Sequence, residues 1–121
     1  MALPTDDTIL LLHNPRCSKS RATLALLEQH GATFAVRRYL DEPLDERELR
    51  DLGRRLGRSA VAFTRTGQDE FAAAGLTADA SDDEIFAAMA EQPILMERPV
   101  VVRGARARIG RPPEDVLALL D

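Results

Sequence analysis

The sequence predicts an α/β domain with the order strand–helix–strand, a helical block, then strand–strand–helix. Two continuous apolar runs, Thr8–His13 and Pro99–Val102, have the pattern of buried strands. Between them, two signals for helix N-termini begin at Asp45 and Ser81. With 121 residues, of which 45% are hydrophobic, the chain has the size and composition of one domain, residues 1–121, with its own core.

The first three elements form a predicted βαβ unit. The strand Thr8–His13 stops at Asn14-Pro15, and the apolar residues of Ser18–His30 suit a helix that Gly31 is suited to end. Thr33–Leu40 follows as the second strand. A strand, a helix and a strand within about 30 residues predict two parallel strands joined by a right-handed crossover.

Residues from about 44 to 92 form a predicted helical insertion. Asp45 with Glu48, and Ser81 with Glu84, have the spacing of a capping box. The first of these helices is expected to end near Leu56, and Pro93 is expected to end the second. Two shorter helices are expected between them, at Ala60–Phe63 and Gln68–Ala74.

The elements after the insertion are short. Pro99–Val102 is a predicted buried strand, Gly104-Ala105 suits a type II′ hairpin turn, and Arg106–Ile109 alternates as the return strand. Pro112-Pro113 begins a last helix, because proline is favoured in the first turn.

Charge and cysteine content exclude several classes of function. The net charge of −4 argues against a nucleic-acid or membrane-surface binder. The single cysteine, Cys17, excludes an intrachain disulfide framework, a cysteine-rich zinc site and a CxxC redox pair, and we expect no metal site. No apolar run approaches the ~20 residues of a membrane span, and Met1–Asp7 carries no basic residue. We therefore expect a cytoplasmic protein with a reduced thiol.

Cys17 is the main candidate for chemistry. Three basic residues stand close to it in the sequence: Arg16, Lys19 and Arg21. Nearby cations and a helix N-terminus both lower the pKa of a thiol. A free cysteine is usually a small buried hydrophobe, but Pro15 is the one apolar residue within three positions of Cys17, so the pattern favours a reactive thiolate. The free N–H groups of the helix start, with Ser18 and Ser20, also suit an anion.

The two histidines have different expected roles. His13 either supplies positive charge that stabilises the thiolate or is a partly buried strand residue with a satisfied ring, and both interpretations stay open. His30 is expected to be a solvated partner of the helix dipole.

Arginine supplies every basic residue except Lys19. One group is expected mostly on solvated faces, several of them paired with acids at helical spacing: Arg37, Arg38, Arg47, Arg50, Arg54, Arg55 and Arg58. Arg98 and Arg111 differ, because each directly precedes a proline, and a guanidinium on a fixed backbone suits an oxyanion.

Three segments resemble the glutaredoxin-linked (ArsC-like) arsenate reductase family, especially its shorter members. They are HNPRCSKSR at 13–21, QPILMERPVVV at 92–102 and ARIGRPPE at 107–114. The resemblance runs from Ile9 to Leu120. It implies a thioredoxin-like fold (βαβ–ββα) with a helical insertion between the second and third strands, and a cis peptide bond before Pro99.

The resemblance also assigns roles to residues. It implies that Cys17 is the nucleophile that attacks arsenate, and that His13 and Ser20 favour its thiolate. The arginines implied to bind the oxyanion are Arg65, Arg98 and Arg111. The implied reaction reduces arsenate to arsenite with glutathione as co-substrate, glutaredoxin as partner and no bound cofactor.

Two alternatives remain open beside arsenate reduction. Arg16 and Lys19 place more positive charge near the thiol than many family members carry, and the chain lacks the C-terminal extension of the longer members. These departures favour a paralogue. The alternatives to arsenate reduction are thus a glutathione-linked thiol reductase of another substrate and a non-enzymatic, partner-binding adaptor similar to transcription regulators.

Overall fold

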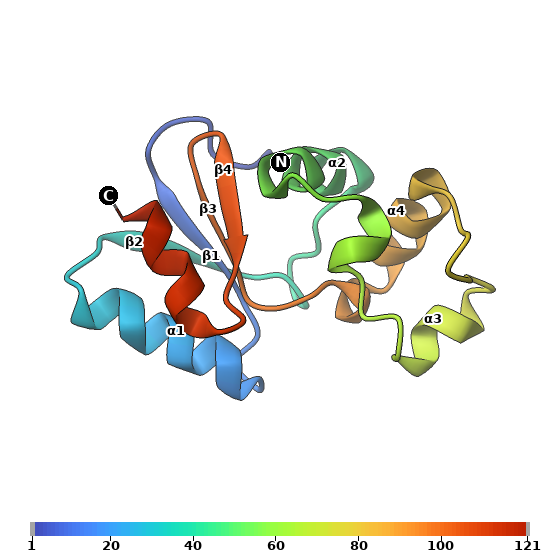
Figure 1. Cartoon of the computed structure of the whole chain (residues 1–121), viewed down its shortest axis with the longest axis horizontal. Helices are drawn as coiled ribbons and strands as arrows, with labels where there is room; N and C mark the ends of the chain where they lie inside the picture. Colours follow the sequence, from blue (N-terminus) through green and yellow to red (C-terminus); the bar gives the residue numbers. More distant parts are fainter. Residues whose placement is uncertain (1, 121) are drawn as a thin grey trace.

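A computed structural model describes residues 2–120, and Figure 1 shows their arrangement. Four strands form one mixed sheet: β1 (Ile9–His13), β2 (Phe34–Arg38), β3 (Val100–Arg103) and β4 (Arg106–Ile109). Their order across the sheet is β2-β1-β3-β4, with β1 and β2 parallel and the other neighbours antiparallel. This is the thioredoxin-like arrangement that the resemblance implied, and each strand lies where the sequence predicts one.

The ends of β1 and β2 mark where a site can form. All five residues of β1 are buried, because the strand is central and helices cover the sheet. The register pairs His13 with Arg38, so the chain leaves both strands side by side. In open α/β sheets, ligands bind outside the carboxyl ends of parallel strands.

One face of the sheet is covered by α1 (Ser18–Gln29) and by η3 (Pro113–Leu119), which lie side by side (Figure 1). Their small core consists of Ile9, Leu11, Leu27, Val101, Val116 and Leu119. The predicted last helix is present, but it is a 3₁₀ helix. Its buried residues Pro113, Val116 and Leu119 recur every third position, and three residues per turn put such positions on one side.

The helical insertion covers the other face and extends beyond the sheet (Figure 1). Its elements are α2 (Glu46–Leu56), η1 (Ala60–Phe63), α3 (Asp69–Ala73), α4 (Asp82–Glu91) and η2 (Pro93–Leu95). Both predicted capping boxes are formed, since the Asp45 carboxylate accepts from the Glu48 N–H at 2.8 Å and the Ser81 hydroxyl from the Glu84 N–H at 3.2 Å.

A buried ion pair joins this insertion to the sheet. Arg37 of β2 and Glu48 of α2 form a bidentate pair at 2.6 and 3.1 Å, with side chains only 8% and 3% exposed. Arg37 also donates to the carbonyl oxygens of Glu42 and Pro43, so its guanidinium is well satisfied. The expectation that Arg37 lies on a solvated face is therefore wrong.

Arg55 pairs with an acid at helical spacing, as predicted, but its side chain is only 8% exposed. Its guanidinium pairs with Asp51 and donates to the carbonyl oxygens of Pro4 and Gly104, which ties α2 to the N-terminal segment and the β3–β4 turn. The other arginines of the group are exposed as predicted: Arg38, Arg47, Arg50, Arg54 and Arg58. The turn itself has Gly104 at φ +58° and Ala105 at negative φ, as a type II′ turn requires.

Gly110 is the point of closest approach between the loop after β4, helix α1 and Pro99. A Cβ at Gly110 would lie 2.7 Å from Thr23 Oγ1 and 2.8 Å from Pro99 Cγ. The Gly110 N–H also donates to the Pro99 carbonyl at 2.9 Å, so the loop cannot move away from Pro99 without breaking this hydrogen bond.

Gly110→Ala should therefore destabilise the fold by about 1–3 kcal/mol, the usual cost of overpacking. The measurement is urea unfolding followed by circular dichroism. Gly67→Ala is the matched control, because a Cβ there meets no atom within 4 Å. Equal stability of the two variants would contradict the close packing around Gly110.

Glu48→Gln should lower the free energy of unfolding by about 3–5 kcal/mol, because it leaves the charge of Arg37 buried without its partner. The control is Asp83→Asn, which breaks the exposed Arg50–Asp83 pair and should cost at most about 1 kcal/mol. Both are measured by urea unfolding, and a Glu48 effect as small as that of Asp83 would show that the buried pair is not an anchor.

Candidate functional site

Cys17 is the N-cap residue of α1, directly after the loop that leaves β1. A turn fixes this loop, because the Cys17 N–H donates to the Asn14 carbonyl and the Arg16 N–H to the Asn14 side-chain oxygen, both at 3.0 Å. The first helical bond follows from the Arg21 N–H to the Cys17 carbonyl. The cysteine is partly exposed, so an external reagent can reach its thiol.

The surroundings of the thiol favour the thiolate. Burial alone would raise the pKa of Cys17, but the backbone N–H groups of Ser20 and Lys19 and the guanidiniums of Arg98 and Arg111 outweigh it and lower the pKa below its usual value. The two amides act on the sulfur without closing a capping hydrogen bond. A lowered pKa is what a nucleophilic cysteine requires.

These arginines are distant in sequence from Cys17. The basic residues nearest to Cys17 in the sequence are not the cations that lower its pKa. Arg16 and Lys19 are exposed, and Arg21 donates to the Pro15 carbonyl. The cations that lower the pKa of the thiol come instead from the loops around Pro99 and Pro112.

His13 and Ser20 form a buried pair behind the cysteine loop. His13 Nδ1 lies 2.6 Å from Ser20 Oγ, and that oxygen also accepts from the Asn14 N–H at 3.0 Å. Burial, together with Arg38 and Arg21, lowers the pKa of His13. This favours the neutral ring at neutral pH, and of the two interpretations of His13 it supports the satisfied strand histidine. A catalytic role for His13 and Ser20 stays a prediction.

Arg98 and Arg111 are held together by the backbone. The peptide bonds Arg98–Pro99 and Arg111–Pro112 are both cis, the first as the resemblance implied. The Arg111 Nε donates to the Arg98 carbonyl at 2.9 Å. Arg98 also pairs with the neighbouring Glu97 at 3.2 Å.

Arg65 reaches the same place through a short backbone pairing. Thr64 and Met96 form an isolated antiparallel bridge, and the Arg65 N–H donates to the Leu95 carbonyl at 2.7 Å. Burial and the charge of Arg98 lower the pKa of Arg65, whereas the anionic form of Cys17 acts to raise it. The charges of Arg65, Arg98 and the thiolate are therefore close enough to influence one another.

The structure thus brings the predicted site residues to one place at the end of β1. It also adds Tyr39, which the sequence analysis treated only as part of the second strand. Its side chain is 1% exposed, and its hydroxyl interacts electrostatically with Arg98, Arg65 and Cys17. The sequence signal that could have identified Tyr39 is its position. It directly follows Arg38, the last residue of β2, which pairs with His13 at the end of β1.

Comparisons with known proteins show to which family the chain belongs. The family model described as "ArsC family" matches residues 12–119. This chain belongs to the ArsC family. An arsenate reductase of Neisseria meningitidis serogroup B is 43% identical over 93% of this chain and 97% of its own length. The uncharacterized protein YfgD of Escherichia coli K12 is 45% identical over 93% and 96%.

Solved structures agree with the ArsC assignment. An arsenate reductase from Vibrio cholerae superposes with a TM-score of 0.89 at 44% identity, covering 94% of this chain and 98% of that one. The likeness extends over the sheet, the insertion and the site loops alike, since it spans nearly the whole of both chains.

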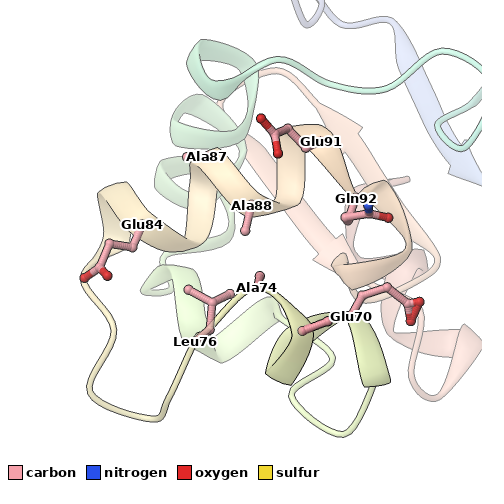
Figure 2. Close-up of a pocket in the computed structure, with 9 residues that line it drawn as sticks. Glu70, Ala74, Leu76, Glu84, Ala87, Ala88, Glu91 and Gln92 are labelled. Atoms are coloured by element: carbon pink, nitrogen blue, oxygen red, sulfur yellow. The ribbon is translucent and has the colours of Figure 1, made fainter.

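A cavity elsewhere in this ArsC chain has chemistry different from that of the site at Cys17. It has a volume of about 520 Å³ and lies between α3 and α4, where Figure 2 shows Glu70, Glu84 and Glu91 around Ala88 and Leu76. Its charged lining is acidic and includes neither a thiol nor an arginine, so it repels an oxyanion.

Two further features are absent from residues 2–120. No group of three or more His, Cys, Asp and Glu side chains there is arranged to hold a metal ion. No helix in the same part of the chain has the length and apolar character needed to cross a bilayer.

Arg98→Ala and Arg111→Ala should each raise the pKa of Cys17. Removal of a nearby positive charge destabilises the thiolate, so a smaller fraction is ionised at pH 7 and alkylation is slower. The measurement is the rate of iodoacetamide alkylation from pH 4 to 10. Arg16→Ala is the matched control and should leave the profile unchanged; a larger effect there than at Arg98 would mean that the sequence neighbours set the pKa.

Proposed function

We propose that this chain reduces arsenate to arsenite with glutathione and glutaredoxin. The observation that carries the proposal is a thiol of lowered pKa that neighbours Arg65, Arg98 and Arg111 at a helix N-terminus. Arsenate is a tetrahedral oxyanion, and guanidiniums together with free backbone N–H groups are the donors that bind such a group. Relatives that cover nearly the whole chain bear the name arsenate reductase.

In the proposed first step, Cys17 Sγ attacks the arsenic atom. A sulfur–arsenic bond forms, and one oxygen leaves as water after taking up protons. Arsenic is still As(V) at this stage. The three arginines and the α1 amides hold the negative oxygens in place and stabilise the charge that develops on them.

The electrons must come from other molecules. Reduction of As(V) to As(III) takes two electrons, which the oxidation of two thiols to one disulfide supplies, and Cys17 is the only cysteine of the chain. Glutathione adds to arsenic and displaces a second oxygen as water. The glutaredoxin thiolate then attacks the glutathione sulfur, the bond from that sulfur to arsenic breaks, and its electron pair remains on arsenic. Water releases arsenite and restores the Cys17 thiol.

A cavity beside the cysteine loop supports an anionic co-substrate. It has a volume of about 310 Å³, and its polar lining consists of His13, Asn14, Arg16, Arg38 and one acid, Asp41. Glutathione carries two carboxylates, which the guanidiniums of Arg16 and Arg38 would attract. A cytoplasmic location follows from the proposal, because glutathione keeps thiols reduced there.

The test is arsenate-dependent NADPH consumption by the purified protein, coupled to glutathione, glutaredoxin and glutathione reductase. We expect activity that disappears in Cys17→Ser and when glutathione is omitted. Arg108→Ala, an exposed change on β4, is the control and should keep full activity.

Three outcomes would contradict the proposal. Activity that persists in Cys17→Ser would remove the thiolate from the reaction. No arsenate-dependent activity, with an alkylation profile that still shows a low pKa for Cys17, would favour a glutathione-linked reductase of another substrate. Partner capture that survives Cys17→Ser, together with no turnover of any oxyanion, would favour an adaptor.

A further inference from the structure

The hydroxyl of Tyr39 is buried without a partner. The residue is 1% exposed, and among residues 2–120 its oxygen finds no hydrogen-bond partner. The Asn14 side chain approaches it, but without the geometry of a hydrogen bond. A buried hydroxyl that makes no hydrogen bond costs stability, so its presence calls for a function.

The fold directs this hydroxyl toward the site. Tyr39 follows β2 directly, and the register sets the end of β2 beside the end of β1. The tyrosine belongs to the apolar core between the sheet and the insertion, together with Leu12 and Met96. Its hydroxyl lies within the electrostatic reach of Arg98, Arg65 and Cys17, which are the groups that surround the proposed oxyanion.

The hydroxyl is a donor at physiological pH. Burial raises the pKa of Tyr39, the anionic form of Cys17 acts in the same direction, and the opposing effects of Asn14, Arg98 and Arg65 do not cancel them. Arginine side chains are donors only, so Arg65 and Arg98 cannot accept the proton of this hydroxyl. The described side chains supply no acceptor for this proton, and an oxygen of a bound ligand is a suitable one.

We propose that the Tyr39 hydroxyl donates a hydrogen bond to an oxygen of the tetrahedral oxyanion bound between Cys17, Arg65 and Arg98. The assignment rests on the oxyanion site of the proposed function and adds a neutral donor to its charged ones. Such a donor sits on the buried side of the anion, where little water competes and a hydrogen bond to a charged oxygen is strong.

Tyr39→Phe tests the assignment, because it removes only the hydroxyl and keeps the ring in the core. Binding of inorganic arsenate, phosphate and sulfate is measured by titration calorimetry in the absence of glutathione. We expect the dissociation constant to rise about tenfold for the anion that the wild type binds, as for loss of one hydrogen bond to a charged group.

The anion-free stability separates this role from a structural one. Without its hydroxyl the variant loses no hydrogen bond, so its Tm should be equal to or higher than that of the wild type. Thr64→Val is the matched control. Its hydroxyl is buried too but donates to the Ala60 carbonyl at 2.7 Å, so its removal should lower the Tm. The Cys17 alkylation profile of Tyr39→Phe should match that of the wild type.

Several results would overturn the assignment. They are an unchanged dissociation constant, a lowered Tm in Tyr39→Phe, an alkylation profile shifted to higher pH (which would make the thiolate the acceptor), or a wild type that binds none of the three anions. A wild type that binds phosphate but does not reduce arsenate, with phosphate binding weakened in Tyr39→Phe, would overturn the proposed function and support the role of Tyr39.

Discussion

The close approach of Gly110 to Thr23 and Pro99 is the constraint on which the site depends. With no side chain at this position, the loop after β4 packs directly against α1 and the segment before β3. The bonds from Gly110 to the Pro99 carbonyl and from Arg111 to the Arg98 carbonyl then fix the two arginine loops against each other. The result is that two guanidiniums meet the N-terminus of the one helix that begins with a cysteine.

The insertion contributes to the same site through a chain of anchors. The Arg37–Glu48 pair fixes α2 to β2, and the Thr64–Met96 bridge joins the insertion to the segment that leads to Arg98. Arg65 follows that bridge directly. The helical insertion thus supplies the third guanidinium of the site in addition to part of the apolar core. Loss of the Arg37–Glu48 pair should therefore affect the site as well as the stability of the fold.

Local patterns were sufficient to predict the elements but not the pairing of side chains between them. The apolar runs, both capping boxes and the cysteine at the start of α1 depend on residues within a few positions of one another, and all are confirmed. The burial of Arg37 depends on Glu48, which lies 11 residues away on another element. The 3₁₀ geometry of η3 was missed because its spacing suits an α-helix nearly as well. Arg65 was assigned by resemblance, since its place is fixed by backbone pairing with residues about 30 positions later.

The site has a buried side and an open side, and a single cysteine requires both. His13, Ser20 and Tyr39 are buried, whereas Cys17 is partly exposed and Arg111 is exposed. The buried side excludes water, so hydrogen bonds to an anion are strong there. A fully closed site would exclude the second thiol, and an enzyme with one cysteine cannot complete a two-electron reduction without that thiol. The exposure of Cys17 at the end of β1 is therefore as necessary to the proposed chemistry as the arginines that lower its pKa.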